Sequence, residues 1–319
     1  MSVQGFHTAA RMLARMPTKG MTMNDRSAHR RIRQRERPLW LAVGLATALA
    51  GCASAPAPAS RARAAALVEQ SWAQADGRLL AQAIAGPWRS PANRARDGYR
   101  HPQQTLAFFR VGSRARVIEI SPGAGWYSEI LAPYLRSSGR YIAAVPQAPA
   151  DSGAGKRNAA LKAGFANVQG PFVGAQWHDY DGKAPAFGAP DSADVVLTFR
   201  NVHNWVAADN ADAYFKAFFD VLKPGGVLGV VDHRAKPGAS LDSMKKSGYL
   251  TEALVIDLAT RAGFRLDAKS EINANPKDST QHPNGVWTLP PTNRHDAKDV
   301  AKYQAIGESD RMTLRFVKP

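Results

Sequence analysis

A carboxylate followed by a glycine-rich turn is the first feature of this sequence that could do chemistry. Glu119 belongs to the apolar, β-branched run V-I-E-I at 117–120, and S-P-G-A-G follows at 121–125. The run predicts a buried strand, and the apolar residues spaced over 126–135 predict a helix after the turn. This order of strand, turn and helix brings backbone N–H groups to a ligand. Glu119 could then accept hydrogen bonds from the ligand's amine or hydroxyl groups.

A second polar stretch, R-N-V-H-N-W at 200–205, directly follows the apolar run 192–199. If 192–199 is a buried strand, the stretch borders the ligand crevice of a doubly wound sheet. His203 could act there as a general base, because imidazole titrates near neutral pH, and Asn201 could contact the ligand. Alternatively, Asn201 and His203 only cap the amphipathic helix expected over 207–222.

Two more groups of polar residues lie near predicted strand ends. H-D-Y-D at 178–181 follows a strand expected within 165–177, and Asp232-His233 ends a strand expected over 227–233. The first group is either a ligand contact or a polar turn. His178 and Asp179 would face opposite ways on a strand, which disfavours a metal site. Asp232 and His233 could pair with substrate, although a structural pair is favoured.

Several of these segments resemble one enzyme family. E-I-S-P-G-A-G at 119–125 is similar to motif I of the class I S-adenosylmethionine-dependent methyltransferases, E/D-h-G-x-G-x-G, with Ser121 in place of the first glycine. L-K-P-G-G at 222–226 is similar to a later signature of that family. Over residues 98–319 the chain resembles a narrower group, the predicted methyltransferases of bacterial envelopes, which carry a similar R-N-x-H-x-W.

The resemblance implies S-adenosylmethionine as cofactor and a set of residues that bind it. The implied cofactor-binding residues are Glu119, Ser121, Gly123, Gly125, Asn201 and, beside the adenine, Asp179 and Asp181. His203 is the implied catalytic residue, and no metal is expected. In the family an acidic residue that holds the ribose usually ends the second strand, whereas Pro146-Gln147 stands here.

The implied reaction is methyl transfer to a small or lipid-linked acceptor. Such an enzyme needs mainly positioning, because the sulfonium is already an activated leaving group. The missing ribose carboxylate favours an alternative, a non-catalytic ligand-binding protein on the same fold. A structural envelope protein without any ligand is a third possibility. The chain lacks G-x-S-x-G, which argues against an α/β-hydrolase, and S-G-A-G-K at 152–156 departs from the phosphate-loop pattern.

The N-terminal region predicts a lipoprotein signal. Five arginines at 30, 31, 33, 35 and 37 precede an apolar stretch, 39–50, that is too short to span a bilayer. L-A-G-C then ends at Cys52, the single cysteine of the chain, and matches a bacterial lipobox. We therefore expect lipidation of Cys52, membrane attachment and a periplasm-facing protein of the outer membrane. A plain cleaved signal is the alternative, and translation could begin at Met1 or Met23.

Composition gives weaker constraints on function. The 319 residues are 45% hydrophobic and 21% charged, and 42 Lys and Arg against 26 Asp and Glu give a net charge of +16. Outside the leader the basic residues are scattered, which disfavours nucleic-acid binding. One cysteine excludes an intrachain disulfide and a cysteine-ligated zinc site.

The elements that must position the polar residues indicate an α/β doubly wound, Rossmann-like sheet of seven strands, mostly parallel with one antiparallel strand. The domain order is signal peptide 1–51, flexible tether 52–66 and methyltransferase-like domain 67–319. Within the domain, 67–110 is expected to be a helical cap over the ligand edge or a surface-packed arm. Residues 272–310 are expected to be an irregular excursion that could form a lid. The remaining strands are expected at 140–145, 265–270 and 312–317, with helices at 158–163 and, capped by Thr251, up to Gly263.

Overall fold

The computed structural model describes residues 74–166, 170 and 172–319. The predicted signal peptide, lipobox and tether, including Cys52, lie outside these residues. No helix in the described ranges is both long enough and apolar enough to cross a membrane.

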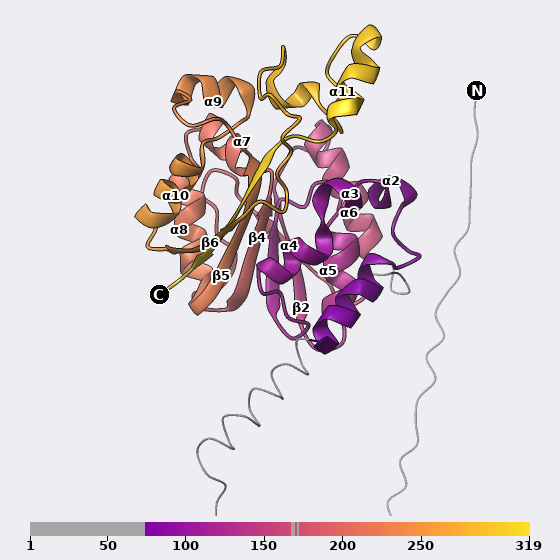
Figure 1. The fold of residues 1–319 in the computed structure, drawn as a ribbon. Coiled ribbons are helices and arrows are strands. Elements are labelled where there is room, and N and C mark those ends of the chain that lie inside the picture. The colour runs from indigo at the N-terminus through magenta and orange to yellow at the C-terminus, as the bar shows by residue number, and fades with distance from the viewer. Residues whose placement is uncertain (1–73, 167–169, 171) are drawn as a thin grey trace, which may run out of the picture. The chain divides into compact units, whose positions relative to one another are not determined.

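The fold is a seven-stranded α/β sheet with the strand order β3-β2-β1-β4-β5-β7-β6 (Figure 1). The first five strands in this order run parallel, and β7 is antiparallel to both β5 and β6. This arrangement confirms the predicted fold class. The strands are β1 (Arg116–Ile120), β2 (Arg140–Pro146), β3 (Gln176–Tyr180), β4 (Ala193–Phe199), β5 (Leu222–His233), β6 (Arg265–Ser270) and β7 (Arg311–Val317).

Helices cover both faces of the sheet (Figure 1). Residues 74–84 are helical and precede three short helices. The helices are α2 (Pro91–Arg94), α3 (Asp97–Arg100), α4 (Pro102–Phe108), α5 (Ser128–Leu135), α6 (Gly153–Ala166), α7 (Val202–Ala207), α8 (Ala211–Val221), α9 (Leu241–Ser247), α10 (Glu252–Arg261) and α11 (Val300–Ile306), with 3₁₀ helices η1 (Gly285–Thr288) and η2 (Ala297–Asp299).

Strand alternation divides the core into two layers. Ile118 and Ile120 of β1 pack in one cluster with aromatic residues of α8 such as Phe215, and with α10. Val117 faces the other cluster, which includes Leu131 of α5 and residues of α4. Because successive side chains of a strand point to opposite faces, each central strand supplies both layers.

Three local predictions need correction. β3 begins at Gln176, so His178 to Tyr180 belong to the strand itself rather than to the loop after it. The polar side chains are tolerated because β3 lies at the sheet edge and is only partly buried. The helix expected at 158–163 is the longer α6, which starts at Gly153 after the Ser152 hydroxyl accepts a hydrogen bond from the Gly155 N–H. The helix expected over 207–222 corresponds to α8, which begins only at Ala211, and the residues before it form the separate helix α7.

Residues 272–310 carry η1, η2 and α11, and several of their side chains are buried. Asn273 donates to the hydroxyls of Thr105 and Thr313, and Asp278 accepts from the Tyr249 hydroxyl and the Asp310 N–H. These hydrogen bonds attach the segment to α4, β7 and the chain before α10. In Figure 1 the yellow α11 lies beyond the same end of the sheet as α9.

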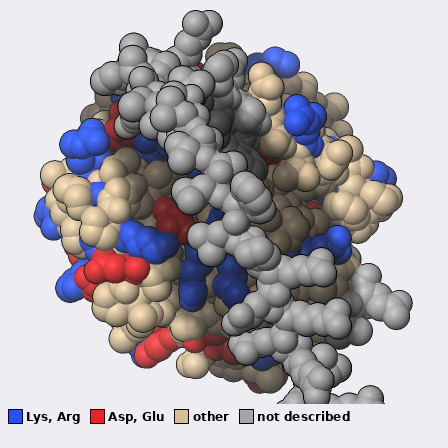
Figure 2. Space-filling model, turned by 90° about the horizontal axis from the view of Figure 1, so that it is seen from below, with Lys and Arg blue, Asp and Glu red and all other residues tan. Residues whose placement is uncertain are grey.

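The face seen in Figure 2 shows Lys and Arg side chains interspersed with Asp and Glu. Among the described residues, exposed ion pairs include Lys216 with Asp220 and Arg261 with Asp212. A mixed pattern of this kind agrees with the scattered basic residues of the sequence.

Candidate functional site at the carboxyl ends of β1 and β4

A cavity of about 270 Å³ lies at the carboxyl ends of β1, β4 and β5. The chain leaves β1 toward β2 and leaves β4 toward β5, so the connections after these two adjacent strands diverge at this point of the sheet. Ligands of open α/β sheets bind at such a divergence. The cavity is lined by Arg96 and Arg100 before α4, the turn 121–124, Trp126 and Tyr127, Arg200 and Asn201 after β4, Pro291, and Arg311 at the start of β7.

The glycine turn needs its glycines for two different reasons. Gly123 has φ +62°, lines the cavity, and a Cβ there would meet nothing within 4 Å. Gly125 has φ +81°, and its Cβ would lie 2.7 Å from Leu161 Cδ1 of α6. Gly123 therefore keeps space open toward a ligand, whereas Gly125 allows close packing of α6.

Two non-glycine residues with positive φ also line the cavity. Ser121 has φ 51° after β1, and Arg200 has φ 63° after β4. The Ser121 hydroxyl lies 2.8 Å from the Tyr180 hydroxyl, and the Arg200 N–H donates to the Val231 carbonyl. Left-handed backbone at non-glycine residues is uncommon and often occurs at functional sites. Its presence at both strand ends supports a function for this cavity.

Glu119 reaches the cavity wall but is only 2% exposed and is already hydrogen-bonded. Its Oε2 accepts from the Tyr141 hydroxyl at 2.6 Å and from the Ser128 hydroxyl at 3.2 Å. Burial raises the pKa of Glu119 to about 7, although these two hydrogen bonds and Arg100 act in the opposite direction. A ligand amine would therefore meet a carboxyl group that is partly protonated near neutral pH and already accepts two hydrogen bonds from the protein.

Asn201 holds the ends of β1 and β4 together. Its Nδ2 donates to the Ile120 carbonyl at 3.0 Å and to the Thr198 hydroxyl at 3.2 Å. Because both amide hydrogens have protein acceptors, Oδ1 is the atom that could accept from a ligand.

Four arginines surround one buried glutamate beside the cavity, and we call this group the arginine cluster. Glu308 accepts from Arg96 Nε at 2.7 Å, Arg100 Nε at 3.3 Å and Arg311 Nη1 at 3.0 Å. The Arg200 Nη1 lies 3.8 Å from the same carboxylate. Burial alone would raise the pKa of Glu308, but the four positive charges outweigh it and lower the pKa to about 2.

His203 and Asp232 form a buried pair behind the cavity. His203, in the first turn of α7, has its Nδ1 2.9 Å from Asp232 Oδ1, and its backbone N–H donates to Asp232 Oδ2. A carboxylate at Asp232 fixes the ring proton on Nδ1 and leaves Nε2 as the basic nitrogen. Neither residue is in the cavity lining, although their chain neighbours Asn201 and Val231 are.

His233 completes a group with His203 and Asp232 whose ligand atoms all lie within 4.8 Å of one another, close enough for a metal ion. Its Nδ1 lies 2.6 Å from the Ser309 hydroxyl. Burial, the His203 ring and the charges of Arg200, Arg311 and Arg100 hold the pKa of His233 well below its ordinary value. The same arginine charges oppose a divalent cation here, so the group fits a hydrogen-bonded pair better than a metal centre.

Four sequence-predicted site residues do not line this cavity: Gly125 and His203, described above, and Asp179 and Asp181. Asp179 accepts from the Trp177 indole at 2.7 Å and lies 3.7 Å from Lys162 Nζ. Asp181 accepts from the Lys183 N–H and forms a polar turn. Neither lines the cavity, whereas Glu119, Ser121, Gly123 and Asn201 do.

Sequence reasoning missed the arginine cluster. The run R-S-P-A-N-R-A-R-D-G-Y-R at 89–100 was an available signal, because its arginine density is high for a helical cap. Nothing in the sequence indicates that Glu308 and Arg311 meet this run more than 200 positions away.

No protein-family profile matches the chain, and no curated protein matches it. Solved structures with similar folds include a SAM-dependent methyltransferase from Aquifex aeolicus, 13% identical with a TM-score of 0.49 over 72% of this chain and 94% of that one. A sarcosine dimethylglycine methyltransferase from Galdieria sulphuraria, named as putative, is 15% identical with a TM-score of 0.47 over 70% and 84%.

The methyltransferase in a complex with the Trm112 activator from Haloferax volcanii is 15% identical, with a TM-score of 0.46 over 76% of this chain and 97% of that one. At these identities the likeness concerns the fold. The observed sheet is seven-stranded and mixed, with antiparallel β7 between β5 and β6.

Proposed function

We propose that this protein transfers a methyl group from S-adenosylmethionine to an acceptor bound at the carboxyl edge of the sheet. One observation carries the proposal: the cavity lies where the connections after β1 and β4 diverge, and it is bounded by the glycine turn. The fold supports it, since ligands of doubly wound sheets bind at this position. The acceptor is a small or lipid-linked molecule.

The residues present fit one half of the cofactor better than the other. Gly123 leaves open space beside the turn, and Asn201 offers Oδ1 as a hydrogen-bond acceptor for the amine. These groups suit the amino-acid end. The nucleoside would extend toward β2 and β3, because about 270 Å³ is at the small end for a pocket that encloses a whole ligand. There β2 ends at Pro146 without a carboxylate for the ribose.

When bound, the cofactor would supply an activated methyl group, and this chain would bind, orient and desolvate the reactants. In this proposal His203 is the base that removes a proton from the acceptor through Nε2. Asp232 orients the ring and stabilises its protonated form. For the acceptor to reach His203, the cavity wall formed by Asn201 and Val231 would have to open.

A second function, ligand binding without catalysis, is favoured by two specific observations. Glu119 is hydrogen-bonded to Tyr141 and Ser128, and no acidic residue follows β2. Both features weaken cofactor binding relative to an enzyme that has these carboxylates free.

The leader supports a cellular location that we also propose. A lipidated Cys52 would attach the protein to the envelope, facing the periplasm. Because the cofactor is made in the cytoplasm, an active enzyme would need a supply of it outside. A non-catalytic binding protein would not.

Calorimetric titration of the full-length chain with S-adenosylmethionine and its demethylated product tests the proposal. We expect micromolar binding that Gly123→Ala weakens by about tenfold or more, because the new Cβ enters the ligand space. Gly238→Ala is the matched control, since Gly238 has φ +81° and equally open surroundings outside this cavity. Both variants strain the backbone by roughly 1–2 kcal/mol, so only ligand contact distinguishes them.

If neither compound binds the folded chain, the ligand-binding alternative replaces the proposed enzyme. If binding is observed and an acceptor is found, His203→Ala should lower turnover by about 10² or more while leaving cofactor affinity nearly unchanged. Equal losses of turnover and affinity would make His203 a positioning residue.

A further inference from the structure

The arginine cluster carries more positive charge than its carboxylate neutralises. Three arginines donate to Glu308 and Arg200 lies close to it, so four guanidinium groups share one carboxylate. Arg311 directs its other hydrogen bonds to the neutral carbonyls of Ser309 and Tyr99. The other nearby acids contribute little, because Glu119 has a pKa of about 7 and Asp232 already binds His203 and two backbone N–H groups.

The excess charge is unfavourable as long as no anion accompanies it. Burial and the charge of Arg200 lower the pKa of Arg100 to about 9. Burial, together with the charges of Arg311 and Arg96, lowers the pKa of Arg200 to about 10 despite Glu308, although 27% of its side chain remains exposed. Guanidinium groups lose a proton more readily in this way when charge repulsion and desolvation exceed the available pairing.

One donor of the cluster is buried without a hydrogen-bond acceptor. Within the described ranges, Arg96 Nη2 has no partner, although Arg96 Nε binds Glu308. Arg96 lines the cavity together with Arg100, Arg200 and Arg311. Buried donors are rarely left unpaired, because each unmade hydrogen bond is costly. The unpaired donor therefore points to an acceptor that a ligand would supply.

We propose that the arginine cluster binds a phosphoryl group, and that this group belongs to the methyl acceptor. A phosphoryl dianion has three oxygens and two negative charges, which suits guanidinium donors arriving from α3, the end of β4 and the start of β7. A carboxylate has one charge and two oxygens, so it would leave more of the cluster unneutralised. The acceptor assignment rests on the proposed function, whereas phosphoryl binding itself does not.

The charge of the acceptor also bears on the cofactor. S-adenosylmethionine has a net positive charge, which the arginine cluster would repel across the cavity. A phosphorylated acceptor in the cluster offsets this repulsion, so each ligand should favour binding of the other.

The test is calorimetric titration of the full-length chain with inorganic phosphate and glycerol phosphate, at low ionic strength and about pH 8, with acetate and chloride as comparison anions. We expect phosphate to bind at least tenfold more tightly than acetate. Arg96→Gln and Arg200→Gln should each weaken phosphate about tenfold, because each loses a charge-assisted hydrogen bond. Arg261→Gln is the matched control, since Arg261 pairs with Asp212 and Asp257 on the surface.

The source of the phosphoryl group is distinguished by a second arm with vesicles. Binding to vesicles of a zwitterionic lipid with added phosphatidic acid, lost in Arg96→Gln and absent without the phosphatidic acid, assigns a lipid headgroup. Binding of glycerol phosphate without vesicle binding assigns a soluble phosphomonoester. Either result supports a phosphoryl site.

Three outcomes would overturn the inference. Phosphate could bind no better than acetate, or Arg96→Gln and Arg261→Gln could behave alike while both remain folded by circular dichroism. Saturating S-adenosylmethionine could also abolish phosphate binding, which would assign the cluster to the cofactor's own carboxylate. Phosphate binding without any affinity for S-adenosylmethionine would leave the phosphoryl site standing and remove the methyltransferase proposal.

Discussion

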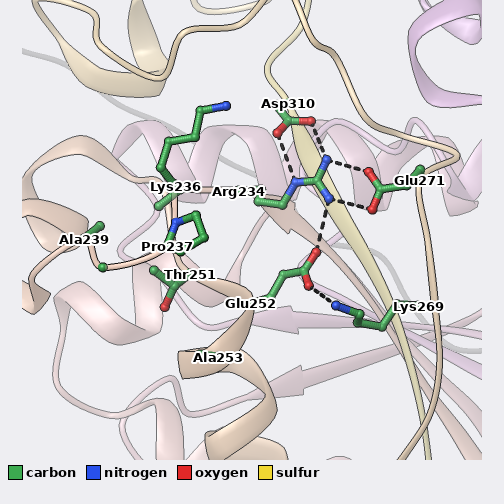
Figure 3. Close-up of a pocket in the computed structure, with 12 residues that line it drawn as sticks. Arg234, Lys236, Pro237, Ala239, Thr251, Glu252, Ala253, Lys269, Glu271 and Asp310 are labelled. Atoms are coloured by element: carbon green, nitrogen blue, oxygen red, sulfur yellow. Dashed lines mark hydrogen bonds and ion pairs between the residues drawn. The ribbon is translucent and has the colours of Figure 1, made fainter.

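Two ion clusters at the same edge of the sheet use the same residue types in opposite proportions. Arg234, which follows β5, binds three carboxylates, those of Asp310, Glu271 and Glu252 (Figure 3). In the arginine cluster four arginines share Glu308 alone. The segment 308–310 supplies an acid to each, so the two clusters lie on one short stretch of chain.

The ratio of arginines to carboxylates separates the structural ion cluster around Arg234, which we call the clamp, from a ligand site. The hydrogen bonds of Arg234 raise its pKa above the ordinary value, Glu271 contributing most, because the charged form is fully paired. Arg100 and Arg200 shift the other way. The positive charge of Arg234 is fully paired by carboxylates of the protein, whereas the arginine cluster needs a bound anion to pair all of its charges. A large open pocket of about 640 Å³ beside Arg234 (Figure 3) therefore offers no unpaired arginine, despite its size.

The largest expected effect comes from removing the acid of the arginine cluster. Glu308→Gln leaves four arginines without a counter-charge and should lower the free energy of unfolding at pH 7 by about 3–5 kcal/mol. Urea unfolding monitored by circular dichroism measures the loss. Phosphate should restore more stability to this variant than to the parent.

The pH dependence of the stability of Glu308→Gln tests whether the loss comes from the charge of Glu308. The folded pKa of Glu308 is about 2, below its ordinary 4.5, so its stabilising effect is complete above 4.5 and is lost as pH falls toward 2. Glu308→Gln should lack that part of the acid slope. A slope equal to that of the parent would contradict the role given to Glu308.

A smaller effect of opposite sign is expected at Glu119. Its folded pKa of about 7 exceeds its ordinary 4.5, so the folded state binds more protons between these values and loses stability as pH rises from 4.5 to 7. Glu119→Gln should remove this loss and be more stable at pH 8 by up to about 3 kcal/mol. Urea titrations at pH 4.5 and pH 8 measure it. Equal pH dependence in variant and parent would mean that Glu119 is solvated.

The smallest effect is expected at the clamp. Arg234→Met leaves Asp310 largely buried without its cation, whereas Glu252 keeps its ion pair with Lys269 and Glu271 is well exposed, so we expect a loss of about 1–2 kcal/mol. Phosphate affinity should stay unchanged in this variant. If Arg234→Met weakens phosphate as much as Arg96→Gln does, the two clusters act as one and the comparison fails.

Local sequence signals predicted the sheet and several helix ends well. The V-I-E-I run lies in β1, and the strand expected over 227–233 is the later part of β5, which also includes L-K-P-G-G. Thr251 caps α10 by accepting from the Leu254 N–H. Each of these depends on neighbouring residues, whose periodicity and capping act over a few positions. β3 was misplaced because its Q-W-H-D-Y sequence lacks the apolar pattern of a buried strand.

The site was predicted only where it follows strand ends. Glu119, Ser121, Gly123 and Asn201 reach the cavity because the carboxyl ends of β1 and β4 are adjacent. The sequence could not show that Tyr141 and Ser128 donate hydrogen bonds to Glu119. It also could not show that Arg96 binds Glu308, which is 212 positions away. These depend on tertiary packing, which no local pattern encodes. The predicted roles of these four cavity residues, and those of Gly125, His203, Asp179 and Asp181, remain predictions.

The position of β7 has a consequence for the order of folding. β7 follows every other strand in the chain yet lies between β5 and β6, and β6 pairs with β7. During synthesis β6 therefore has no partner at the sheet edge until β7 has emerged, and the contacts of Arg96 and Arg100 with Glu308 form no earlier. Pairings between such distant segments have a high contact order and are slow to form. A nascent chain would acquire its parallel half first and its anion-binding cavity last, so it could not capture a ligand before the whole sheet had closed.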